Sequence, residues 1–396
     1  MTAHSLAPAG VDTWLSVPAD TTRALLGGVT GYTASVLRRR LGPLDVAYEL
    51  AEWWQVLTLR EQPQWMTPHD VLTEWPQARL LDFSTVPDDD DQRPTLVLPP
   101  QAGHSSTIVD YSADQSQIRT ARAAGVTRLF CLDWLPATAA TADSSIGDYG
   151  AILDETIERL GGRVNLVGDC QGGWLAALYA GLRPERVAAL AVAAAPIDFH
   201  AGHSAIQDWV RLLGGPTRPR GGTAFYRSLV ALGGGVQPGR NQITGFKMLQ
   251  PAAELERAME LLTHIDDAEY VDDYVRFTNW FEWGQDLPGA FYLWIVEHLF
   301  IDNALITSPL SVPTPTGPAT VDLTRIDCPI FLLAGRRDHI TPPEQVWALA
   351  DHVSTPPTMI SRRLVDAGHL GLFMGTAALH DHWSAVFADL AALPIG

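Results

Sequence analysis

Short apolar segments that alternate with helix-like segments constrain the fold of this chain more than any other feature. Five segments with apolar runs have the length of strands, at 95–98, 127–132, 164–167, 187–194 and 329–333, and 360–365 is a further predicted strand. Helical patterns separate or follow them, around 146–160, 172–182, 343–353 and 377–390. Strands that are apolar on both faces and alternate with helices are typical of a parallel sheet between two helical layers. The sequence therefore predicts an α/β fold with a mostly parallel sheet and helices on both faces.

The alternation stops between residues 201 and 319. Helical stretches in this segment are crowded with aromatic residues, namely Phe277, Trp280, Phe281, Trp283, Phe291, Tyr292 and Trp294. Helices inserted over the carboxyl edge of a parallel sheet commonly form a lid, although such side chains can also only pack the insertion against the core. We predict three parts: a helical or irregular N-terminal segment at 1–93, a core at 94–200 and 320–396, and a lid or cap insertion at 201–319.

The charge balance excludes one class of partner. The chain has 396 residues, of which 45 are acidic and 27 are basic, for a formal net charge of -18. Nucleic-acid binding usually needs a concentrated basic face, so we expect no nucleic-acid partner. The acidic run at 88–91 fits a solvated loop before a strand.

Cysteine usage and the N-terminus bear on compartment and cofactors. Cys131, Cys170 and Cys328 are too few and too scattered for a disulfide framework. No Cys/His cluster has zinc spacing, and we expect neither a metal nor a cofactor. The first twenty residues lack the basic start and apolar core of a secretory signal, and no apolar stretch is long enough to span a bilayer. We therefore expect a reduced, cytoplasmic protein without a transmembrane segment.

Residues 167–173, Val-Gly-Asp-Cys-Gln-Gly-Gly, carry the clearest chemical signal. They lie between a predicted strand and a predicted helix and form a glycine-flanked nucleophile elbow with cysteine in place of serine. The glycines relieve clashes in a strained turn that projects the Cys170 sulfur above the sheet edge. The N–H of Gln171, at the start of the helix, would face a developing oxyanion. The pattern predicts an α/β-hydrolase fold with a helical lid insertion, and Cys131 and Cys328, in or beside apolar strands, as core residues.

The elbow predicts an acid and then a histidine farther along the chain. Asp338 follows the apolar segment 329–333, and His369 follows the next one. In this arrangement Asp338 fixes the tautomer of His369, whose other ring nitrogen takes the thiol proton. Two rivals exist. His339 is adjacent to Asp338 and would point elsewhere, and Asp366 is close to His369 but lies on the wrong side of the histidine loop.

The loop at 99–106 follows the strand that usually supplies a second oxyanion N–H. Gly103 and His104 are the natural candidates in this loop. The alternative is a plain tight turn, and the sequence leaves both open.

With these residues placed, the chain resembles the superfamily of polyhydroxyalkanoate synthases and intracellular polyhydroxybutyrate depolymerases, over residues 94 to 385. The elbow Gly168-Asp-Cys-Gln-Gly-Gly173 looks like the synthase box, and 196–199, 321–323, 328–330 and 338–342 also look synthase-like. Other pieces look more like the depolymerase branch, at 100–104, 245–246 and 368–375. Trp174 directly follows the elbow, where synthases tend to have a small residue.

The resemblance implies an α/β-hydrolase fold and a Cys170, Asp338 and His369 triad. It implies acyl transfer on 3-hydroxyacyl thioesters or polyhydroxyalkanoate esters through a covalent thioester, with hydroxyacyl-CoA or polyester as substrate. A synthase would pass the acyl group to a hydroxyl, whereas a depolymerase or esterase would pass it to water. A non-catalytic protein associated with polyester granules is a further alternative, against which the three preserved groups count. Granule association and a homodimer are likewise implied.

Overall fold

The computed structural model describes residues 11–85, 92–214, 221–249 and 251–394. The acidic run at 88–91 and the first ten residues of the N-terminal stretch lie outside these residues. The chain divides into two compact units. A helical unit combines the described residues of Ala7–Pro63 and Arg240–Gly284, and a sheet unit combines those of Gln64–Gly239 and Gln285–Gly396.

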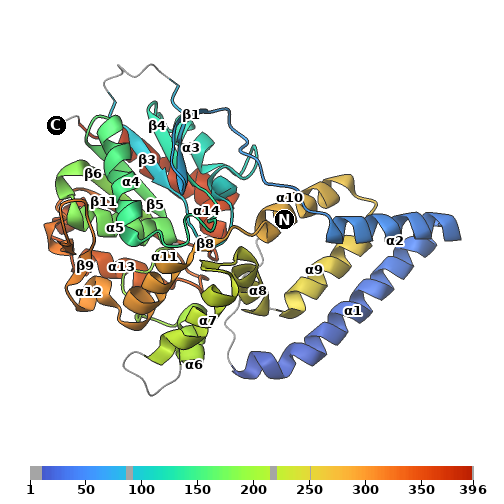
Figure 1. Cartoon of the computed structure of the whole chain (residues 1–396). Coiled ribbons are helices and arrows are strands. Elements are labelled where there is room, and N and C mark those ends of the chain that lie inside the picture. Colours follow the sequence, from blue (N-terminus) through green and yellow to red (C-terminus); the bar gives the residue numbers. More distant parts are fainter. Residues whose placement is uncertain (1–10, 86–91, 215–220, 250, 395–396) are drawn as a thin grey trace. The chain divides into compact units, whose positions relative to one another are not determined.

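The sheet unit is built on eight strands in the order β1-β2-β4-β3-β5-β6-β11-β12 (Figure 1). Their bounds are β1 (Asp70–Glu74), β2 (Ala78–Asp82), β3 (Thr95–Leu98), β4 (Leu129–Trp134), β5 (Val164–Asp169), β6 (Val187–Ala193), β11 (Ile330–Gly335) and β12 (Ile360–Val365). Strand β2 runs antiparallel to both of its neighbours, and the other pairs are parallel. All six predicted strands are confirmed, and so is the mostly parallel sheet.

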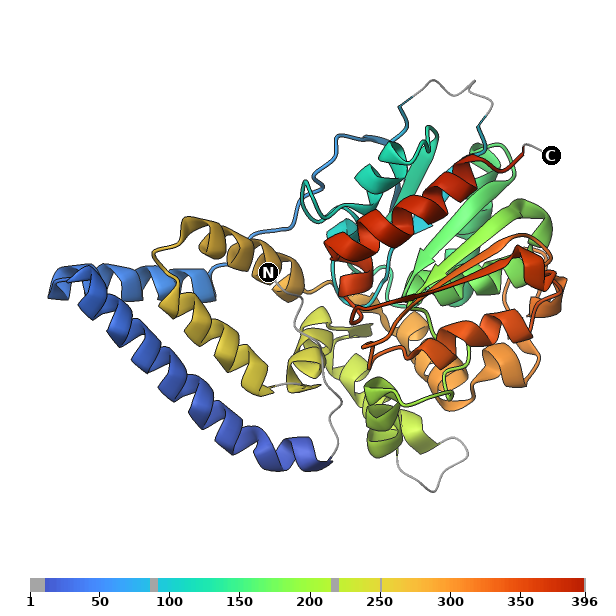
Figure 2. The ribbon, with the colours of Figure 1, turned by 180° about the vertical axis from the view of Figure 1, so that it is seen from behind.

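Helices cover both faces of this sheet, as predicted. Helices α4 (Ile146–Arg159) and α5 (Gln171–Leu182) lie on the face that is seen in Figure 1. Helices α3 (Gln117–Ala123) and α15 (Ser384–Ala391) lie together on the opposite face (Figure 2). Strands β3, β4, β5 and β11 have only buried residues, which is the expected result of covering both faces. This strand order, with the elbow at the end of β5, is the α/β-hydrolase fold.

The sheet begins earlier than the sequence predicted. Strands β1 and β2 fall within 1–93, which was predicted to be helical or irregular. Strand β1 lies at the sheet edge and buries none of its residues, so it lacks the apolar pattern of a buried strand. Strand β2 is short and carries Arg79 and Asp82 beside its apolar residues. Neither strand has the continuous apolar run that marks five of the six predicted strands.

The predicted insertion at 201–319 is divided between the two units. Its middle part belongs to the helical unit, with most of α8 (Gly239–Leu249) and all of α9 (Pro251–Thr263) and α10 (Ala268–Glu282). The flanking parts belong to the sheet unit and comprise α6 (Ala205–Gly214), α7 (Ala224–Leu232), α11 (Gly289–Trp294), a π-helix (Ile295–Ile301) and α12 (Ala304–Thr307). The predicted boundaries therefore differ from the units of the structure.

The helical unit holds together because α1 (Val11–Arg39) and α2 (Pro43–Thr58) pack on the helices from the insertion. A Cβ atom added at Gly28 would lie 2.4 Å from the Met259 Cβ, so α1 approaches α9 closely at this glycine. The indole N–H of Trp53 donates to the Ala258 carbonyl at 2.7 Å. Segments more than 200 residues apart thus share one small core.

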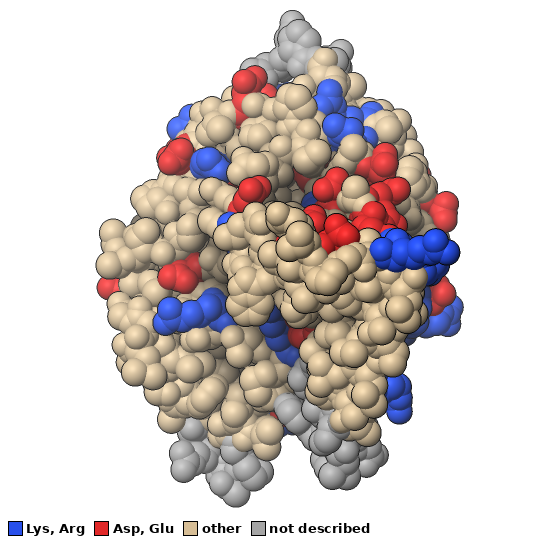
Figure 3. Space-filling view, turned by 90° about the vertical axis from the view of Figure 1, so that its right-hand side faces the viewer, with Lys and Arg blue, Asp and Glu red and all other residues tan. Residues whose placement is uncertain are grey.

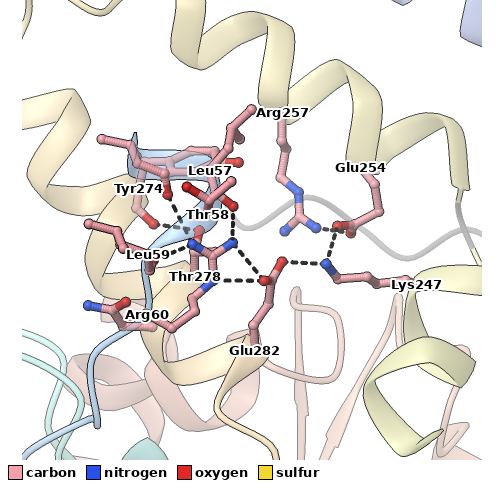
Figure 4. A network of polar contacts seen from close by, with 12 residues as sticks. Leu57, Thr58, Leu59, Arg60, Lys247, Glu254, Arg257, Tyr274, Thr278 and Glu282 are labelled. Atoms are coloured by element: carbon pink, nitrogen blue, oxygen red, sulfur yellow. Dashed lines mark hydrogen bonds and ion pairs between the residues drawn. The ribbon is translucent and has the colours of Figure 1, made fainter. Parts of the chain in front are cut away.

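A network of charged side chains links α8, α9 and α10 to the end of the α2 segment (Figure 4). The Arg60 Nε donates to Glu282 at 2.7 Å, and Lys247 bonds the other carboxylate oxygen. Lys247 also pairs with Glu254, which in turn bonds Arg257. The Arg257 guanidinium lies over the ring of Phe277 at 5.2 Å from its centroid. Burial lowers the pKa of Arg257.

Aromatic residues of the predicted insertion pack within their own units. Phe291 is buried and its ring centroid lies 4.1 Å from that of Tyr149 on α4. Trp294 lies at 6.3 Å from Trp174 on α5. These side chains contribute to the core of the sheet unit.

The surface carries few charges for its size. Most side chains on the face in Figure 3 are neither acidic nor basic, and acidic ones are densest right of the centre, with others scattered over the face. Within the described ranges, we find no helix that combines the length and the apolar character needed to cross a membrane.

Candidate active site

Cys170 occupies the turn between β5 and α5, as the elbow motif predicts. Its backbone has φ +48° and ψ -113°, a conformation that residues other than glycine rarely adopt. The Cys170 N–H donates to the Ala193 carbonyl at the end of β6, at 2.8 Å. This bond and the following helix hold the turn in its strained conformation. Cys170 is half-buried, whereas Cys131 and Cys328 are buried.

Three positions of the elbow must be glycine because neighbouring atoms leave no room for a Cβ atom. A Cβ atom at Gly168 would lie 2.4 Å from the Gly172 carbonyl oxygen, and one at Gly172 would lie 1.9 Å from the Leu98 carbonyl oxygen. A Cβ atom at Gly173 would meet the Ala195 Cβ at 2.4 Å. These distances are far below van der Waals contact, so larger residues would push the elbow away from β3 and β6.

The structure brings Cys170, His369 and Asp338 together. The His369 Nε2 lies 3.2 Å from the Cys170 sulfur, and the Nδ1 lies 2.7 Å from an Asp338 carboxylate oxygen. The other Asp338 oxygen accepts the backbone N–H groups of Ile340 and Thr341, both at 2.9 Å. The carboxylate is thus fixed by two backbone bonds, and it orients the imidazole toward the sulfur.

Electrostatics favour a charged imidazole at this site. Burial opposes the imidazolium form of His369, but the Asp338 carboxylate and the Cys170 sulfur outweigh it and raise the pKa of His369 well above its usual range. The other two cysteines are buried in the core. Burial raises the pKa of Cys131 strongly and that of Cys328 to about 12, so both stay thiols.

The two rival residues lie elsewhere. Asp366 is 76% exposed and pairs with Arg337 at 3.2 Å, away from the His369 ring. Burial lowers the pKa of His339, which opposes a cationic role, and its carbonyl accepts from Ala205. Neither residue takes part in the hydrogen bonds that join His369, Asp338 and Cys170.

The candidate oxyanion groups come from two segments, the start of α5 and the loop that follows β3. Gln171 is the first residue of α5, so its N–H is one of those that a helix leaves without an intrahelical partner. Gly103 has φ +85°, and its carbonyl accepts the Gln285 N–H at 2.9 Å. His104 is buried in the same loop. This loop continues from β3, whose Leu98 carbonyl touches Gly172, so it borders the elbow.

Trp174 departs from the synthase pattern without entering the site. It is 1% exposed and packs into the core against Phe291 and Trp294. The larger residue therefore packs into the core with these two aromatic rings. Among the residues that the structure describes, no group of three or more His, Cys, Asp or Glu side chains could hold a metal ion.

The comparisons with known proteins place the chain in a family. Residues 72–395 match the family described as "Protein of unknown function (DUF3141)". The chain belongs to this family. The match covers the sheet unit and the inserted helices, and it begins within β1.

Relatives with a named function confirm the resemblance to polyhydroxyalkanoate synthases. The poly(3-hydroxyalkanoate) polymerase subunit PhaC of Haloferax mediterranei is 24% identical over 83% of this chain and 65% of its own length. The protein of that name from Haloarcula marismortui is 23% identical over 81% and 66%. An uncharacterized protein in the ackA 5' region of Rhizobium meliloti is 28% identical over 77% of this chain and 42% of its own length. The chain thus spans less than two thirds of these relatives.

Solved structures are more distant. A Bacillus megaterium epoxide hydrolase is 15% identical, with a TM-score of 0.49, over 81% of this chain and 100% of that chain. A Paleococcus ferrophilus monoacylglycerol lipase is 17% identical, with a TM-score of 0.47, over 80% and 99%. The fold assignment rests on the strand order and the elbow of this chain.

Proposed function

We propose that the chain is an enzyme that transfers 3-hydroxyacyl groups through a covalent thioester on Cys170, in the manner of a polyhydroxyalkanoate synthase. The observation that carries this proposal is the continuous chain of contacts from Cys170 to His369 to Asp338, which follow strands β5, β12 and β11 of the sheet. Nucleophilic catalysis needs a nucleophile, a base within hydrogen-bond reach and a group that orients the base.

The first half-reaction forms the acyl-enzyme. His369 accepts the Cys170 proton, and the thiolate attacks the carbonyl carbon of a hydroxyacyl-CoA. The N–H of Gln171, with an N–H of the loop at Gly103 and His104, stabilises the oxyanion. The bond between the acyl carbon and the CoA sulfur then breaks, and the CoA thiolate takes the proton from His369. A thiolate suits this exchange because it attacks and leaves with similar ease.

The second half-reaction decides the product. His369 removes the proton of an incoming hydroxyl, whose oxygen attacks the Cys170 thioester and releases the sulfur as a thiolate. If the hydroxyl belongs to a hydroxyacyl group, the product is an ester bond and the chain grows. If it belongs to water, the product is a free hydroxy acid. The names of the relatives favour the hydroxyacyl acceptor.

The proposal includes no cofactor beyond the CoA of the substrate. It also includes association with polyester granules and a homodimer, which the family resemblance implies. In this proposal, the inserted helices that belong to the sheet unit limit the access of water to the acyl-enzyme.

The test supplies 3-hydroxybutyryl-CoA to the purified protein and measures CoA release, polymer and free acid. We expect CoA release together with polymer, and loss of both in Cys170→Ala. Free acid without polymer would replace the synthase with a hydrolase that uses water. CoA release that persists in Cys170→Ala would overturn the thioester mechanism itself.

A cysteine elsewhere in the sheet provides the matched control. Cys328→Ala removes a buried thiol with a raised pKa and leaves the elbow intact. We expect iodoacetamide to modify Cys170 first, since Cys131 and Cys328 are buried. Alkylation that abolishes turnover in the wild type and in Cys328→Ala assigns the activity to Cys170.

A further inference from the structure

Asp169 is a buried carboxyl group that the proposed reaction does not use. It is the last residue of β5 and directly precedes Cys170. Its exposed fraction is 0%, and the oxygen Oδ2 has no hydrogen-bond partner. An ionised carboxylate in this position would carry a full charge with one oxygen unsatisfied, which is strongly unfavourable. The sequence signal for such a group is only an acidic residue at the end of an apolar strand.

Gln117 is the hydrogen-bond partner that the structure gives to Asp169. The Gln117 Nε2 donates to the Oδ1 of Asp169 at 3.4 Å. Gln117 is also fully buried, and its own oxygen, Oε1, has no hydrogen-bond partner. One weak bond therefore joins an amide and a carboxyl that each keep one oxygen without a hydrogen-bond partner.

The two unsatisfied oxygens belong to the same pair of groups, and a single proton satisfies both. An amide places its oxygen beside its nitrogen, and a carboxyl places Oδ2 beside Oδ1. A protonated Oδ2 becomes an O–H donor that can bond the Gln117 Oε1, while the Gln117 Nε2 continues to donate to Oδ1. The result is a closed ring of two hydrogen bonds between a neutral acid and an amide.

We propose that Asp169 is protonated in the folded protein, and that its two-bond pair with Gln117 is a positioning device that ties helix α3 to the elbow and holds Cys170 in register with His369. The proposal rests on the proposed function, because positioning matters only if Cys170 reacts. Asp169 and Gln117 touch no reacting atom and act through the elbow.

The surroundings favour the neutral form. Burial raises the pKa of Asp169 to about 8, against smaller lowering effects of the Gln117 bond and of His369. Cys131 on β4 interacts electrostatically with Asp169. The other acidic residues that act on Cys131 are Asp110 and Asp133. The cationic group that acts on Asp169 is the His369 imidazolium, which is already paired with Asp338.

Hydrogen bonds at the start of helix α3 hold it in place, so that Gln117 can position the elbow through Asp169. Ser116 caps the helix by accepting the Arg119 N–H at 2.9 Å, and its hydroxyl donates to Asp110 at 2.6 Å. Asp110 also accepts the N–H and the hydroxyl of Thr67. Gln117, the first residue of α3, therefore extends from a rigid point toward the elbow.

The protonation state is tested directly by infrared difference spectroscopy between the wild type and Asp169→Asn. We expect a carbonyl band of a protonated carboxyl group at pH 7 that is absent in Asp169→Asn and disappears as the pH rises through about 8. A carboxylate band at pH 7 in place of the acid band would overturn the proposal, because an ionised Asp169 cannot donate to Gln117.

The positioning role is tested by the rate of Cys170 alkylation with iodoacetamide. Asp169→Asn keeps one donor and one acceptor, so we expect a rate close to that of the wild type at pH 7, without the inflection near pH 8. Gln117→Ala removes both bonds and should slow alkylation about tenfold, as expected for a lost buried hydrogen-bond pair. If Gln117→Ala does not fold, Gln117→Leu, which keeps the volume, takes its place.

Asn165→Ala is the matched control. Asn165 is buried at the other end of β5 and bonds Thr95 and the Leu390 carbonyl, far along the strand from Cys170. An equal loss of the Cys170 alkylation rate in Asn165→Ala and Gln117→Ala would mean that both substitutions act only by lowering the overall stability. That result would overturn the positioning role of the Asp169 and Gln117 pair. Failure of the proposed function is distinguishable, since CoA release that persists in Cys170→Ala leaves the infrared result on Asp169 unaffected.

Discussion

Asp338 acts at the scale of one residue, because its carboxylate decides which nitrogen of His369 faces the sulfur. Its two oxygens are fully used, by His369 on one side and by two backbone N–H groups on the other. The exposed Asp366, three residues before His369 in the chain, has no such contact. The two aspartates therefore provide a clean comparison between a positioned and a solvated carboxylate.

We expect Asp338→Asn to reduce single-turnover CoA release by about a thousandfold or more, since an amide at this position stabilises the wrong tautomer of the histidine. Asp366→Asn should leave the rate within about twofold, because the exposed ion pair with Arg337 contributes little. Both rates are measured by rapid mixing with hydroxybutyryl-CoA. Equal effects of the two substitutions would contradict the role of Asp338.

Gly172 and Gly150 allow a second comparison between single residues. Gly172→Ala places a Cβ atom 1.9 Å from the Leu98 carbonyl oxygen and should lower the free energy of unfolding by about 3 kcal/mol or more. Gly150 lies in α4 with nothing within 4 Å of an added Cβ, so Gly150→Ala should raise it by about 0.5–1 kcal/mol. Urea unfolding measures both changes.

At the scale of elements, the charged network of the helical unit joins segments that are remote in the chain. Glu282 at the end of α10 bonds both Arg60 and Lys247, and its side chain is 22% exposed. Removing one partner of a partly buried, hydrogen-bonded ion pair lowers the stability of the fold, because the remaining charge is left without compensation.

We expect Glu282→Gln to destabilise the helical unit by about 1–3 kcal/mol, because it leaves Arg60 and Lys247 with one carboxylate fewer. Hydrogen exchange should accelerate in α9 and α10 and stay unchanged in β5 and β6. Asp273→Asn, which removes an exposed pair with Arg276 on the outside of α10, is the control and should have little effect. Faster exchange throughout the sheet would contradict the assignment of this network to one unit.

At the scale of the whole molecule, Asp169 and His369 shape the dependence of stability on pH. The folded-state pKa of Asp169 is raised to about 8 by burial, so between pH 4 and 8 the folded chain binds a proton that the unfolded chain has lost. Stability therefore falls as the pH rises through this window. The pKa of His369 is also raised in the folded state. The contribution of His369 to the free energy of unfolding is therefore complete below the ordinary histidine pKa and is lost as the pH rises through the folded-state pKa.

We expect Asp169→Asn to be increasingly more stable than the wild type as the pH rises from 4 to 8, by at most ~1.4 kcal/mol per pH unit. The difference should stay constant above about pH 8, where Asp169 is ionised in both states. The decline due to His369 should remain in the variant. Thermal unfolding across this range provides the measurement, and a difference that does not change with pH would show that Asp169 is ionised throughout.

The sequence by itself determined the sheet core and the candidate nucleophile. Five of the six predicted strands contain a continuous apolar run, which is typical of a sheet covered on both faces, and 360–365 was predicted beside them despite its polar residues. Cys170 was identified because its glycines and flanking elements are local in the chain. Asp338 and His369 were selected by their order after the elbow, and the structure places both within hydrogen-bonding distance.

Only the tertiary structure decided the features that depend on distant partners. Strand β1 is an exposed edge whose residues have no apolar pattern to read. The helical unit joins the described residues of 7–63 to those of 240–284 through contacts such as Gly28 with Met259, which no local sequence pattern predicts. The pair of Asp169 and Gln117 likewise forms between residues 52 positions apart. Such contacts follow from packing in three dimensions, whereas strands and turns follow from the local periodicity of the chain.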